Sequence, residues 1–422
     1  MTSSIIPQKA SFSLRKKIFW LDNLAKKGLI NRLTNISRGY LRIIDEGEVM
    51  RFGNANTESD CKATIKISDR RFYSAIAFGG SVAAGESYFS GHWECDNLTA
   101  LVRILLINRE VLDNMDESFS RIQAPIMQIL HWLSRNTREG SKKNISVHYD
   151  LGNDLFKLFL DKNMMYSSAI YPSADSTLEE ASTYKLERIC QKLQLSEKDH
   201  LLEIGTGWGG FAIYAAQNYG CKITTTTISE EQFILAKKRI EDAGFSSKIT
   251  VLLSDYRDLK GRYDKLVSIE MIEAIGHQYI NTYFKKCSEL LKPKGVMLIQ
   301  AITIADQRYK SALKEVDFIK RYIFPGCFIP SVNAMQDAIT KSSDMRIFNL
   351  EDIGPHYAKT LHDWRRRFFN NIESVKALGY PEEFVRLWDF YLCYCEGGFI
   401  ERVISDVQLT LVKPNNRLEY SD

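Results

Sequence analysis

The sequence predicts an α/β protein with a mostly parallel, doubly wound sheet and a second, smaller domain before it. One observation is that short apolar stretches alternate with amphipathic helical stretches after residue 144, which is the pattern of a parallel sheet covered by helices. Another is the length of 422 residues, which suits two domains at roughly 100–200 residues each. In such sheets, ligands bind at the carboxyl ends of the strands.

The individual elements follow from apolar spacing and from glycine and proline punctuation. A glycine-rich turn at residues 205–210 joins the first strand to a helix that runs through Asn218, and a turn at residues 292–295 precedes the last strand. The expected strands are residues 201–204, 222–227, 248–253, 265–269 and 296–304, and the further expected helices are residues 229–243 and 278–291.

A polar stretch at residues 134–144 marks the expected hinge between the domains, because it combines glycine, serine and charged residues. We place the boundary after residue 135, which gives an N-terminal domain of residues 1–135 and a second domain of residues 136–422. The N-terminal domain is predicted to contain both strands and helices. Its apolar patterns predict strands at residues 62–67 and 72–78 and helices at residues 98–112 and 122–133.

Composition argues against several classes of function. A net charge of +4 is too small to indicate a nucleic-acid-binding protein. No apolar run reaches the roughly 18–20 residues that span a bilayer, and the first residues lack the charged and apolar blocks of a signal peptide. The eight cysteines include no CxxC pair, so we expect neither a metal site nor a redox motif, and we expect a cytoplasmic location.

The strongest local signal is the glycine turn with the residue before it. Gly205, Gly207 and Gly210 formally match the dinucleotide motif GxGxxG, which alone is weak. The acidic residue that usually holds the ribose about 20 residues further on is missing. Glu203 stands two residues before the first glycine, where a carboxylate suits the cationic amine of S-adenosylmethionine. These features favour S-adenosylmethionine over NAD, and a glycine turn without a ligand stays open as an alternative.

Seven short motifs follow one another along the chain: residues 147–154 (VHYDLGND), 165–169 (MYSSA), the glycine turn, 228–232 (ISEEQ), 255–257 (DYR), 270–277 (EMIEAIGH) and 322–325 (YIFP). In this order they resemble the cyclopropane-fatty-acyl-phospholipid synthase family, which includes mycolic acid cyclopropane synthase-like methyltransferases. Any one motif is weak, but the ordered set is specific. The resemblance runs from about residue 144 to residue 414 and continues more weakly upstream through residues 85–88 and 93–95.

The resemblance implies a Rossmann-like, seven-stranded S-adenosylmethionine-dependent methyltransferase domain and a smaller N-terminal α+β domain that helps to engage lipid. It implies transfer of a methylene group to the cis double bond of an unsaturated fatty-acyl chain in membrane phospholipid, which forms a cyclopropane fatty acid. Glu203 would contact the cofactor by the argument above, and the other cofactor residues match family positions. Together the expected cofactor residues are Tyr149, Tyr166, Ser167, Glu203, Gly205, Gly207, Thr227, Gln232, Tyr256 and Arg257.

The resemblance also implies a base for the reaction. In the family, a bound bicarbonate is taken to remove a proton from the new methyl group, and Glu273, Ile302 and Tyr357 match positions of the polar cluster that holds it. Ser168 stands where many members have cysteine, and Gln300 stands where the best-studied bacterial type has histidine. Neither side chain titrates near pH 7 as histidine does. A methyl or methylene branch is therefore an alternative product.

Three further expectations concern neighbouring residues and the membrane. Cys395 matches a cysteine often placed in the family's active site, although a lone cysteine is commonly a small buried apolar residue. Glu270 and His277 are expected to act through their neighbours. Residues 324–330 form a candidate membrane-contacting loop, because glycine and prolines interrupt an apolar run, with a buried turn as the alternative. Membrane contact would be peripheral, at the inner face, and a homodimer stays open.

Two other functions stay open at this point. One is a small-molecule N-methyltransferase, because relatives with this core act on amines; the N-terminal region and the pair Glu273 and Tyr357 weigh against it. The other is a lipid-binding protein without catalysis, against which the intact glycine turn weighs.

Overall fold

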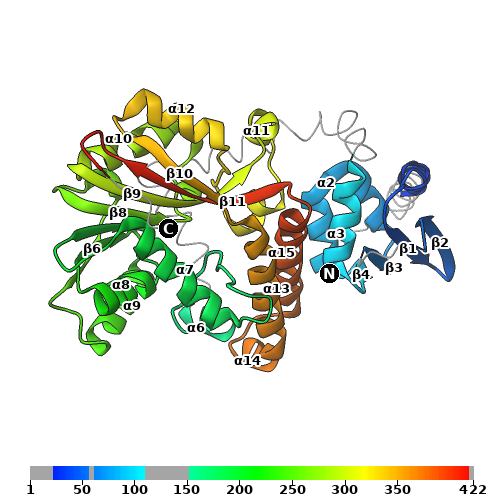
Figure 1. The fold of residues 1–422 in the computed structure, drawn as a ribbon. Helices are drawn as coiled ribbons and strands as arrows, with labels where there is room; N and C mark the ends of the chain where they lie inside the picture. Colours follow the sequence, from blue (N-terminus) through cyan, green and yellow to red (C-terminus); the bar gives the residue numbers. More distant parts are fainter. Residues whose placement is uncertain (1–21, 57–60, 110–151, 418–422) are drawn as a thin grey trace, which may run out of the picture. The chain divides into compact units, whose positions relative to one another are not determined.

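A computed structural model describes residues 22–56, 61–109 and 152–417 of the chain (Figure 1). The chain divides into two compact units: the first is Met1–Met127 with Pro381–Gly397, and the second is Gln128–Tyr380 with Gly398–Asp422. The predicted boundary after residue 135 lies outside the described residues and stays a prediction. No pattern in the sequence indicated that Pro381–Gly397 belongs to the first unit.

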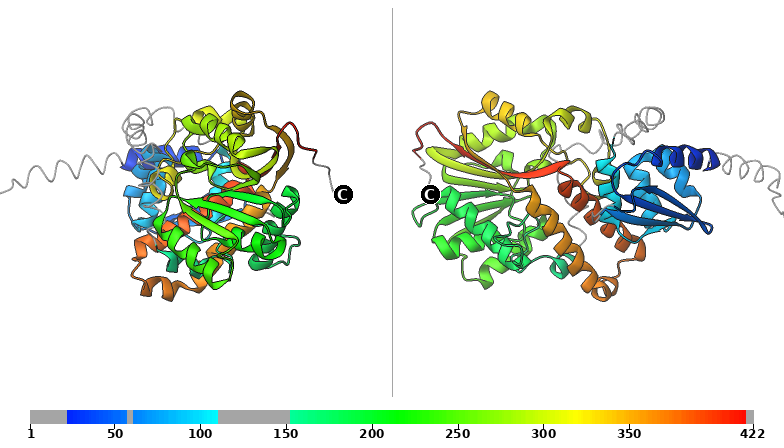
Figure 2. Two further views of the ribbon diagram at one scale, coloured as in Figure 1. Left: turned by 90° about the vertical axis from the view of Figure 1, so that its left-hand side faces the viewer. Right: turned by 45° about the vertical axis from the view of Figure 1, so that its right-hand side comes forward.

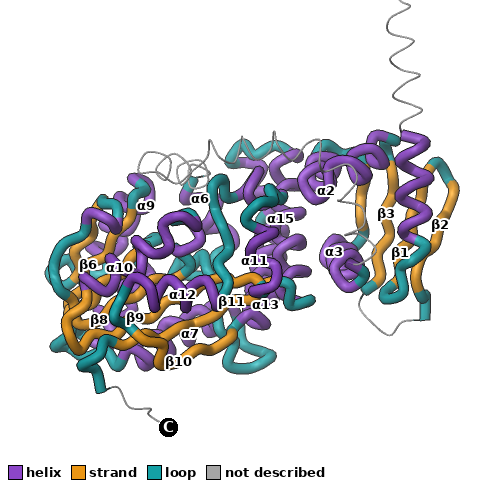
Figure 3. Tube along the Cα trace, turned by 90° about the horizontal axis from the view of Figure 1, so that it is seen from above, coloured by secondary structure: helices purple, strands orange, loops and turns teal. Residues whose placement is uncertain are grey.

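The first unit is built on a four-stranded sheet in the order β2-β1-β3-β4. Its central strands β1 and β3 are parallel, while β2 and β4 are antiparallel to their neighbours. Figure 3 shows β1, β2 and β3 side by side. The strands are β1 (Tyr40–Asp45), β2 (Glu48–Gly53), β3 (Lys62–Ile67) and β4 (Trp93–Cys95), and the helices are residues 22–33, α2 (Arg71–Phe89), α3 (Leu98–Ile107) and most of α15 (Glu382–Ile400).

Two sequence predictions for this unit can be compared with the structure. The strand at residues 62–67 is confirmed as β3, and the helix predicted from residue 98 is confirmed as α3 over the described residues. The strand predicted at residues 72–78 is wrong, because these residues open helix α2. A short apolar run does not distinguish a strand from a helix by its periodicity. The helix predicted at residues 122–133 lies outside the described residues.

The second unit is a seven-stranded sheet in the order β10-β11-β9-β8-β5-β6-β7, which confirms the Rossmann-like expectation. Strands β9, β8, β5, β6 and β7 are parallel, and β10 and β11 are antiparallel additions at one edge. The strands are β5 (His200–Ile204), β6 (Lys222–Thr227), β7 (Ile249–Leu253), β8 (Tyr263–Ile269), β9 (Leu291–Ile304), β10 (Arg346–Asp352) and β11 (Ile404–Val412).

Helices cover both faces of this sheet (Figure 2). One buried cluster joins the sheet to α10 and α12 through Phe284, Met335 and Leu409, and the other joins it to α7 and α8 through Ile189, Phe211 and Leu298. The helices are α6 (Asn153–Phe159), α7 (Leu178–Leu193), α8 (Gly210–Tyr219), α9 (Glu230–Asp242), α10 (Ile280–Leu290), α11 (Asp306–Ala312), α12 (Val332–Ser342), α13 (Gly354–Asn370) and α14 (Ile372–Ala377).

The predicted turn at residues 292–295 lies inside β9 as an irregularity of the ladder. Leu291 pairs with Tyr263 while Val296 pairs with Lys265, so the intervening residues bulge away from β8. Among the described residues, no helix is long and apolar enough to cross a membrane.

Candidate active site

The glycine turn lies between β5 and α8, at the carboxyl edge of the parallel strands. Gly207 has a φ of +52° and a side chain there would meet nothing within 4 Å, so open space adjoins the backbone. At Gly210 a Cβ would lie 2.1 Å from the Asn163 carbonyl oxygen, which explains a glycine at the start of α8. A bare backbone, open space and a helix N-terminus at a strand edge fit the methionine and ribose parts of S-adenosylmethionine.

The next strand and turn place the other predicted cofactor residues along the same edge. At the end of β6, the Thr227 hydroxyl donates to Gln232 Oε1 at 2.8 Å. Arg257 is held by Asp255 and lies 5.6 Å from the Tyr256 ring. The Tyr256 hydroxyl is buried and makes no hydrogen bond within the described residues. A buried hydroxyl without a partner fits a ligand group beside it.

Glu203 lies behind the glycine turn. Its carboxyl accepts a hydrogen bond from the Thr225 hydroxyl at 2.6 Å, and that hydroxyl is 2.7 Å from the Thr206 hydroxyl. Burial raises the pKa of Glu203 to about 8. The carboxyl therefore ties the turn to β6, and its contact with a cofactor amine stays a prediction.

Tyr166 and Ser167 lie in the loop that follows α6. Tyr166 stacks on Trp364 with ring centroids 5.2 Å apart, and Ser167 Oγ accepts a hydrogen bond from the fully buried Lys185 at 2.7 Å. Burial lowers the pKa of Lys185 to about 8, which is the consequence of placing an ammonium group in the interior. No motif or spacing in the sequence singled out Lys185. Tyr149 lies outside the described residues, so its role stays a prediction.

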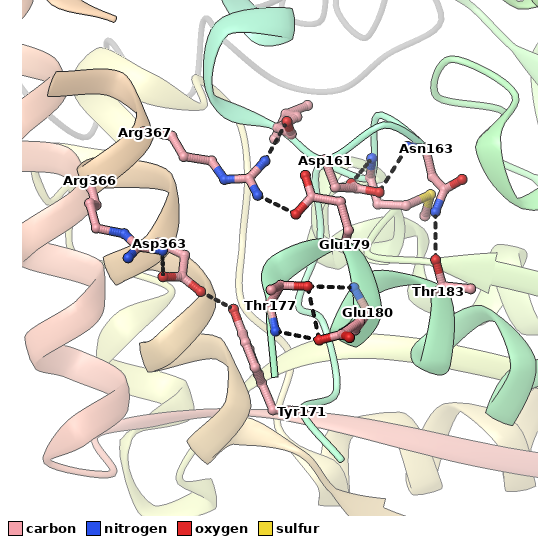
Figure 4. A network of polar contacts seen from close by, with 12 residues as sticks. Asp161, Asn163, Tyr171, Thr177, Glu179, Glu180, Thr183, Asp363, Arg366 and Arg367 are labelled. Atoms are coloured by element: carbon pink, nitrogen blue, oxygen red, sulfur yellow. Dashed lines mark hydrogen bonds and ion pairs between the residues drawn. The ribbon is translucent and has the colours of Figure 1, made fainter. Parts of the chain in front are cut away.

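A polar network anchors this loop on α7 and α13 (Figure 4). Asp161 accepts from the backbone N–H groups of Asn163 and Met165 at 2.8 and 3.0 Å. Arg367 pairs with Glu179, and the Tyr171 hydroxyl donates to Asp363 at 2.8 Å (Figure 4). These contacts fix the backbone on either side of Tyr166, Ser167 and Ser168.

Three of the predicted reaction residues converge on one carboxylate at the end of β8. Glu270 accepts hydrogen bonds from the Ser168 N–H at 2.7 Å, the Gln300 side-chain amide at 2.8 Å and the Tyr357 hydroxyl at 2.7 Å. We call these three donors the anion cradle. Its members come from the loop after α6, from β9 and from α13, which meet only in the folded chain.

Glu273 lies one turn beyond Glu270. Its Oε1 accepts from the Ile302 N–H at 2.6 Å, as the resemblance implies, while Oε2 is buried with no partner among the described residues. Burial first, and the charge of Glu270 second, raise the pKa of Glu273 to about 8. Burial therefore favours the protonated form of Glu273.

Asp406 on β11 completes the cluster. It is fully buried, and the Gln300 side-chain amide donates to its Oδ2 at 3.0 Å. Burial, followed by the charge of Glu270, raises the pKa of Asp406 well above its usual value. An acidic residue within an apolar strand was the available sequence signal for Asp406.

A family model described as mycolic acid cyclopropane synthetase matches residues 136–409. The chain belongs to this family. The resemblance inferred from the motifs is thereby confirmed, and the protein is an S-adenosylmethionine-dependent methyltransferase.

Individual members of the mycolic acid cyclopropane synthetase family are similar over most of the chain. The tuberculostearic acid methyltransferase UfaA1 of Mycobacterium tuberculosis is 37% identical over 79% of each chain. The cyclopropane-fatty-acyl-phospholipid synthase of Escherichia coli is 38% identical over 82% of this chain and 86% of its own. The structure of the cyclopropane synthase MmaA2 from Mycobacterium tuberculosis superposes with a TM-score of 0.60 at 29% identity, covering 64% of this chain and 98% of MmaA2.

Other structural relatives are less specific. Cyclopropane synthase CmaA1, complexed with SAH and CTAB, has a TM-score of 0.59 at 29% identity and covers 64% of this chain and 98% of its own. Coclaurine N-methyltransferase is 20% identical with a TM-score of 0.58, and covers 75% of this chain and 94% of its own. The second likeness shows the fold alone.

Two predictions for this family member need comment. Cys395 lies on α15 in the first unit, so its membership of the cluster stays a prediction. The expectation of a membrane-contacting loop at residues 324–330 is wrong for its central residue, because Phe328 is 2% exposed and packs in the core with α10 and α12. An apolar run with glycine and proline forms a buried turn here, which was the alternative.

Proposed function

We propose that the protein transfers a one-carbon group from S-adenosylmethionine to the cis double bond of an unsaturated fatty-acyl chain of membrane phospholipid, forming a cyclopropane fatty acid. The observation that carries this proposal is the convergence of Ser168, Gln300 and Tyr357 on a carboxylate at the strand edge that holds the glycine turn. Similarity to the Escherichia coli synthase over 82% of the chain supports the same reaction.

The chemistry requires a site that tolerates a cation on an apolar chain. S-adenosylmethionine supplies an electrophilic methyl group when it is bound. Tyr357, Trp364 and Tyr166 form a continuous aromatic series, with Tyr357 and Trp364 centroids 6.1 Å apart and those of Trp364 and Tyr166 5.2 Å apart. Aromatic faces stabilise a desolvated cation by about 2 kcal/mol each. The same rings exclude water, which would otherwise trap the cation.

A methylene branch is the second candidate product. Gln300 supplies no titrating imidazole where the best-studied bacterial type has histidine, and a similar relative is the tuberculostearic acid methyltransferase UfaA1. Both products arise from the same initial cation: direct loss of a methyl proton closes the ring, whereas a 1,2-hydride shift before that loss gives the methylene branch. The substrate class is therefore common to both candidates.

We also propose that the first unit contacts the membrane surface peripherally, at its cytoplasmic face. Leu41, Ile43 and Phe52 are buried on one face of its sheet, whereas alternate residues point away from the core. Arg42 and Arg51 are directly paired across β1 and β2 and both are exposed. The same face carries exposed Lys62, Lys66 and Val49, with Glu94 opposite Lys66.

This basic face offers charge complementarity to anionic lipid. Like charges directly opposite one another destabilise a sheet, whereas an anionic surface is attracted by about 1 kcal/mol per well-placed Lys or Arg. Removing two charges in the variant Arg42→Gln/Arg51→Gln should weaken sedimentation with anionic vesicles roughly 30-fold. The affinity for S-adenosylmethionine should not change. Unchanged vesicle binding would remove this face from the proposal.

The proposed reaction is tested on the purified protein with S-adenosylmethionine and vesicles of unsaturated phospholipid. Mass spectrometry of the released fatty acids should show a gain of one CH2. Resistance of that product to mild hydrogenation identifies a cyclopropane, and uptake of hydrogen identifies a methylene branch. No gain in mass despite measurable cofactor binding would contradict the proposal.

A further inference from the structure

The anion cradle is filled by a side chain of the protein itself. All three donors, from Ser168, Gln300 and Tyr357, lie within 2.8 Å of the carboxylate oxygens of Glu270. These are positions at which the resemblance places a bound bicarbonate. A carboxylate and a bicarbonate offer the same planar pair of oxygens, and an ionised carboxylate only accepts hydrogen bonds. The three donors therefore satisfy Glu270 as they would satisfy a free anion.

We infer that Glu270 is the base of the reaction in place of bicarbonate, with Asp406 as a positioning residue behind it. The inference rests on the proposed function, since it names the proton acceptor of that reaction. It also replaces the expectation that Glu270 acts only through its neighbours.

The backbone of Glu270 supports a specific role for its side chain. Its φ of +47° lies in the left-handed region, which residues with a side chain rarely adopt. The Glu270 N–H is held by the Gln300 carbonyl at 2.8 Å, so β9 fixes this conformation. Strain of this kind persists where the surrounding structure imposes it and is concentrated at functional sites.

Asp406 determines which carboxyl group carries the charge. The Gln300 side-chain nitrogen donates to Glu270 at 2.8 Å and to Asp406 at 3.0 Å, so one amide bridges both groups. Two carboxylates this close cannot both ionise easily. Asp406 is fully buried while Glu270 is partly exposed, so burial favours the proton on Asp406. Glu273 and Lys185 are the other titratable groups that act on Asp406.

The proton balance of the step is simple. After methyl transfer, one former alkene carbon bears the new methyl and its neighbour bears the positive charge. A C–H bond of the new methyl then breaks. Its electron pair forms the bond that closes the ring, and its proton goes to the Glu270 carboxylate. A 1,2-hydride shift onto the charged carbon moves the charge to the carbon that bears the methyl group, and loss of a methyl proton to the same carboxylate then gives the methylene branch. Glu270 returns its proton to solvent before the next turnover.

Removing the carboxylate should create a site for the free anion. In Glu270→Gly, glycine suits the left-handed backbone and leaves the three donors of the cradle facing empty space. Product formation should fall at least 100-fold, the lower range for loss of a general base, and millimolar bicarbonate should restore at least a tenth of it. Glu270→Gln should be equally inactive but should not respond to bicarbonate, because its amide still fills the cradle.

A second readout does not depend on turnover. Binding of [13C]bicarbonate, followed by NMR line broadening, should appear in Glu270→Gly and be absent in the wild type. Glu46→Gly is the matched control, because Glu46 also has a left-handed φ, of 48°, and lies in the first unit. All variants should keep the wild-type affinity for S-adenosylmethionine, which shows that they are folded.

Asp406 is tested separately. Asp406→Asn replaces a protonated acid with a neutral amide of the same shape, so the acid limb of the pH–rate profile should stay in place. A shifted acid limb would mean that Asp406 is ionised and would contradict its role.

The outcomes separate this inference from the proposed function. If the wild type yields no CH2 product, the proposed function fails, while the bicarbonate-binding measurement still tests the cradle. If the wild type is active and Glu270→Gln is active too, Glu270 is not the base. A folded Glu270→Gly that neither binds nor responds to bicarbonate would overturn the anion cradle.

Discussion

The proposed cofactor end and the proposed reaction end of the second unit are assembled in different ways. The proposed cofactor end consists of consecutive segments: the turn after β5, the end of β6 with the start of α9, and the turn after β7. The reaction end joins Ser168, Glu270, Gln300 and Tyr357, whose contacts with Glu270 span 102, 30 and 87 positions of sequence. The first end is encoded by local motifs, and the second exists only through tertiary packing.

This difference predicts different kinetic consequences for substitutions. Changes at the cofactor end should weaken binding of S-adenosylmethionine. Changes at the reaction end should leave that affinity intact and slow the chemical step, since they remove interactions that matter only after the methyl group has moved.

The largest effect is expected at the glycine turn. Gly207→Val places a branched side chain in the open space beside the turn, at a φ of +52°. The affinity for S-adenosylmethionine, measured by calorimetry, should fall at least 100-fold. The valine side chain fills the open space and also disfavours the backbone conformation of the turn. Gly244→Val is the matched control, because Gly244 has a φ of +78° with nothing within 4 Å. Equal losses in both variants would show that strain alone is responsible.

A smaller effect is expected at the cradle. Tyr357→Phe removes the hydroxyl that donates to Glu270 at 2.7 Å. The turnover number should fall by about 30-fold, because a charge-assisted hydrogen bond contributes roughly 2 kcal/mol, while the cofactor affinity should stay within twofold. Tyr171→Phe is a fair control, since it removes a buried hydroxyl that donates to Asp363 at 2.8 Å. If Tyr357→Phe lowers the cofactor affinity as much as the turnover number, substitutions at the two ends do not have different kinetic consequences.

The smallest effect concerns the pH dependence of stability. The pKa of Glu273 rises from 4.5 to about 8 on folding, so the folded protein holds a proton that the unfolded chain loses above pH 4.5. The free energy of unfolding should therefore fall as the pH rises from about 4.5 to about 8. In Glu273→Gln, the free energy of unfolding, measured by urea titration, should decrease less steeply with pH. Part of the decrease should remain, because the pKa of Glu203 is also raised to about 8. If the free energy of unfolding of Glu273→Gln depends on pH as steeply as that of the wild type, the raised pKa of Glu273 is contradicted.

The strands and turns that carry the proposed cofactor residues could be predicted from the sequence for a physical reason. Gly205, Gly207, Thr227 and Gln232 lie in turns whose chemistry is set by neighbouring residues. The strands around them alternate with helices at regular spacing, and β6 was predicted at its observed bounds. The strand predicted at residues 72–78 failed because its apolar run suits both a strand and a helix, and α2 formed instead.

The reaction end could be predicted only as a set of residues. The motifs selected five residues that the structure brings together: Ser168, Gln300, Glu273, Ile302 and Tyr357. They did not identify Glu270 as the group on which the hydrogen-bond donors converge. Glu270 offered no local signal beyond an acid at a strand end. The contribution of Asp406 depends on the antiparallel pairing of β11 with β9, which places it opposite Ile302 and near Gln300. No local pattern in the sequence specifies that pairing.

The most direct test of the account is the dependence of wild-type product formation on dissolved bicarbonate. The reaction is run in degassed, bicarbonate-free buffer and again with added bicarbonate, and the CH2 product is measured by mass spectrometry. A built-in carboxylate predicts the same rate in both conditions, within about twofold. A rate that collapses without bicarbonate and recovers on its addition would contradict the role of Glu270.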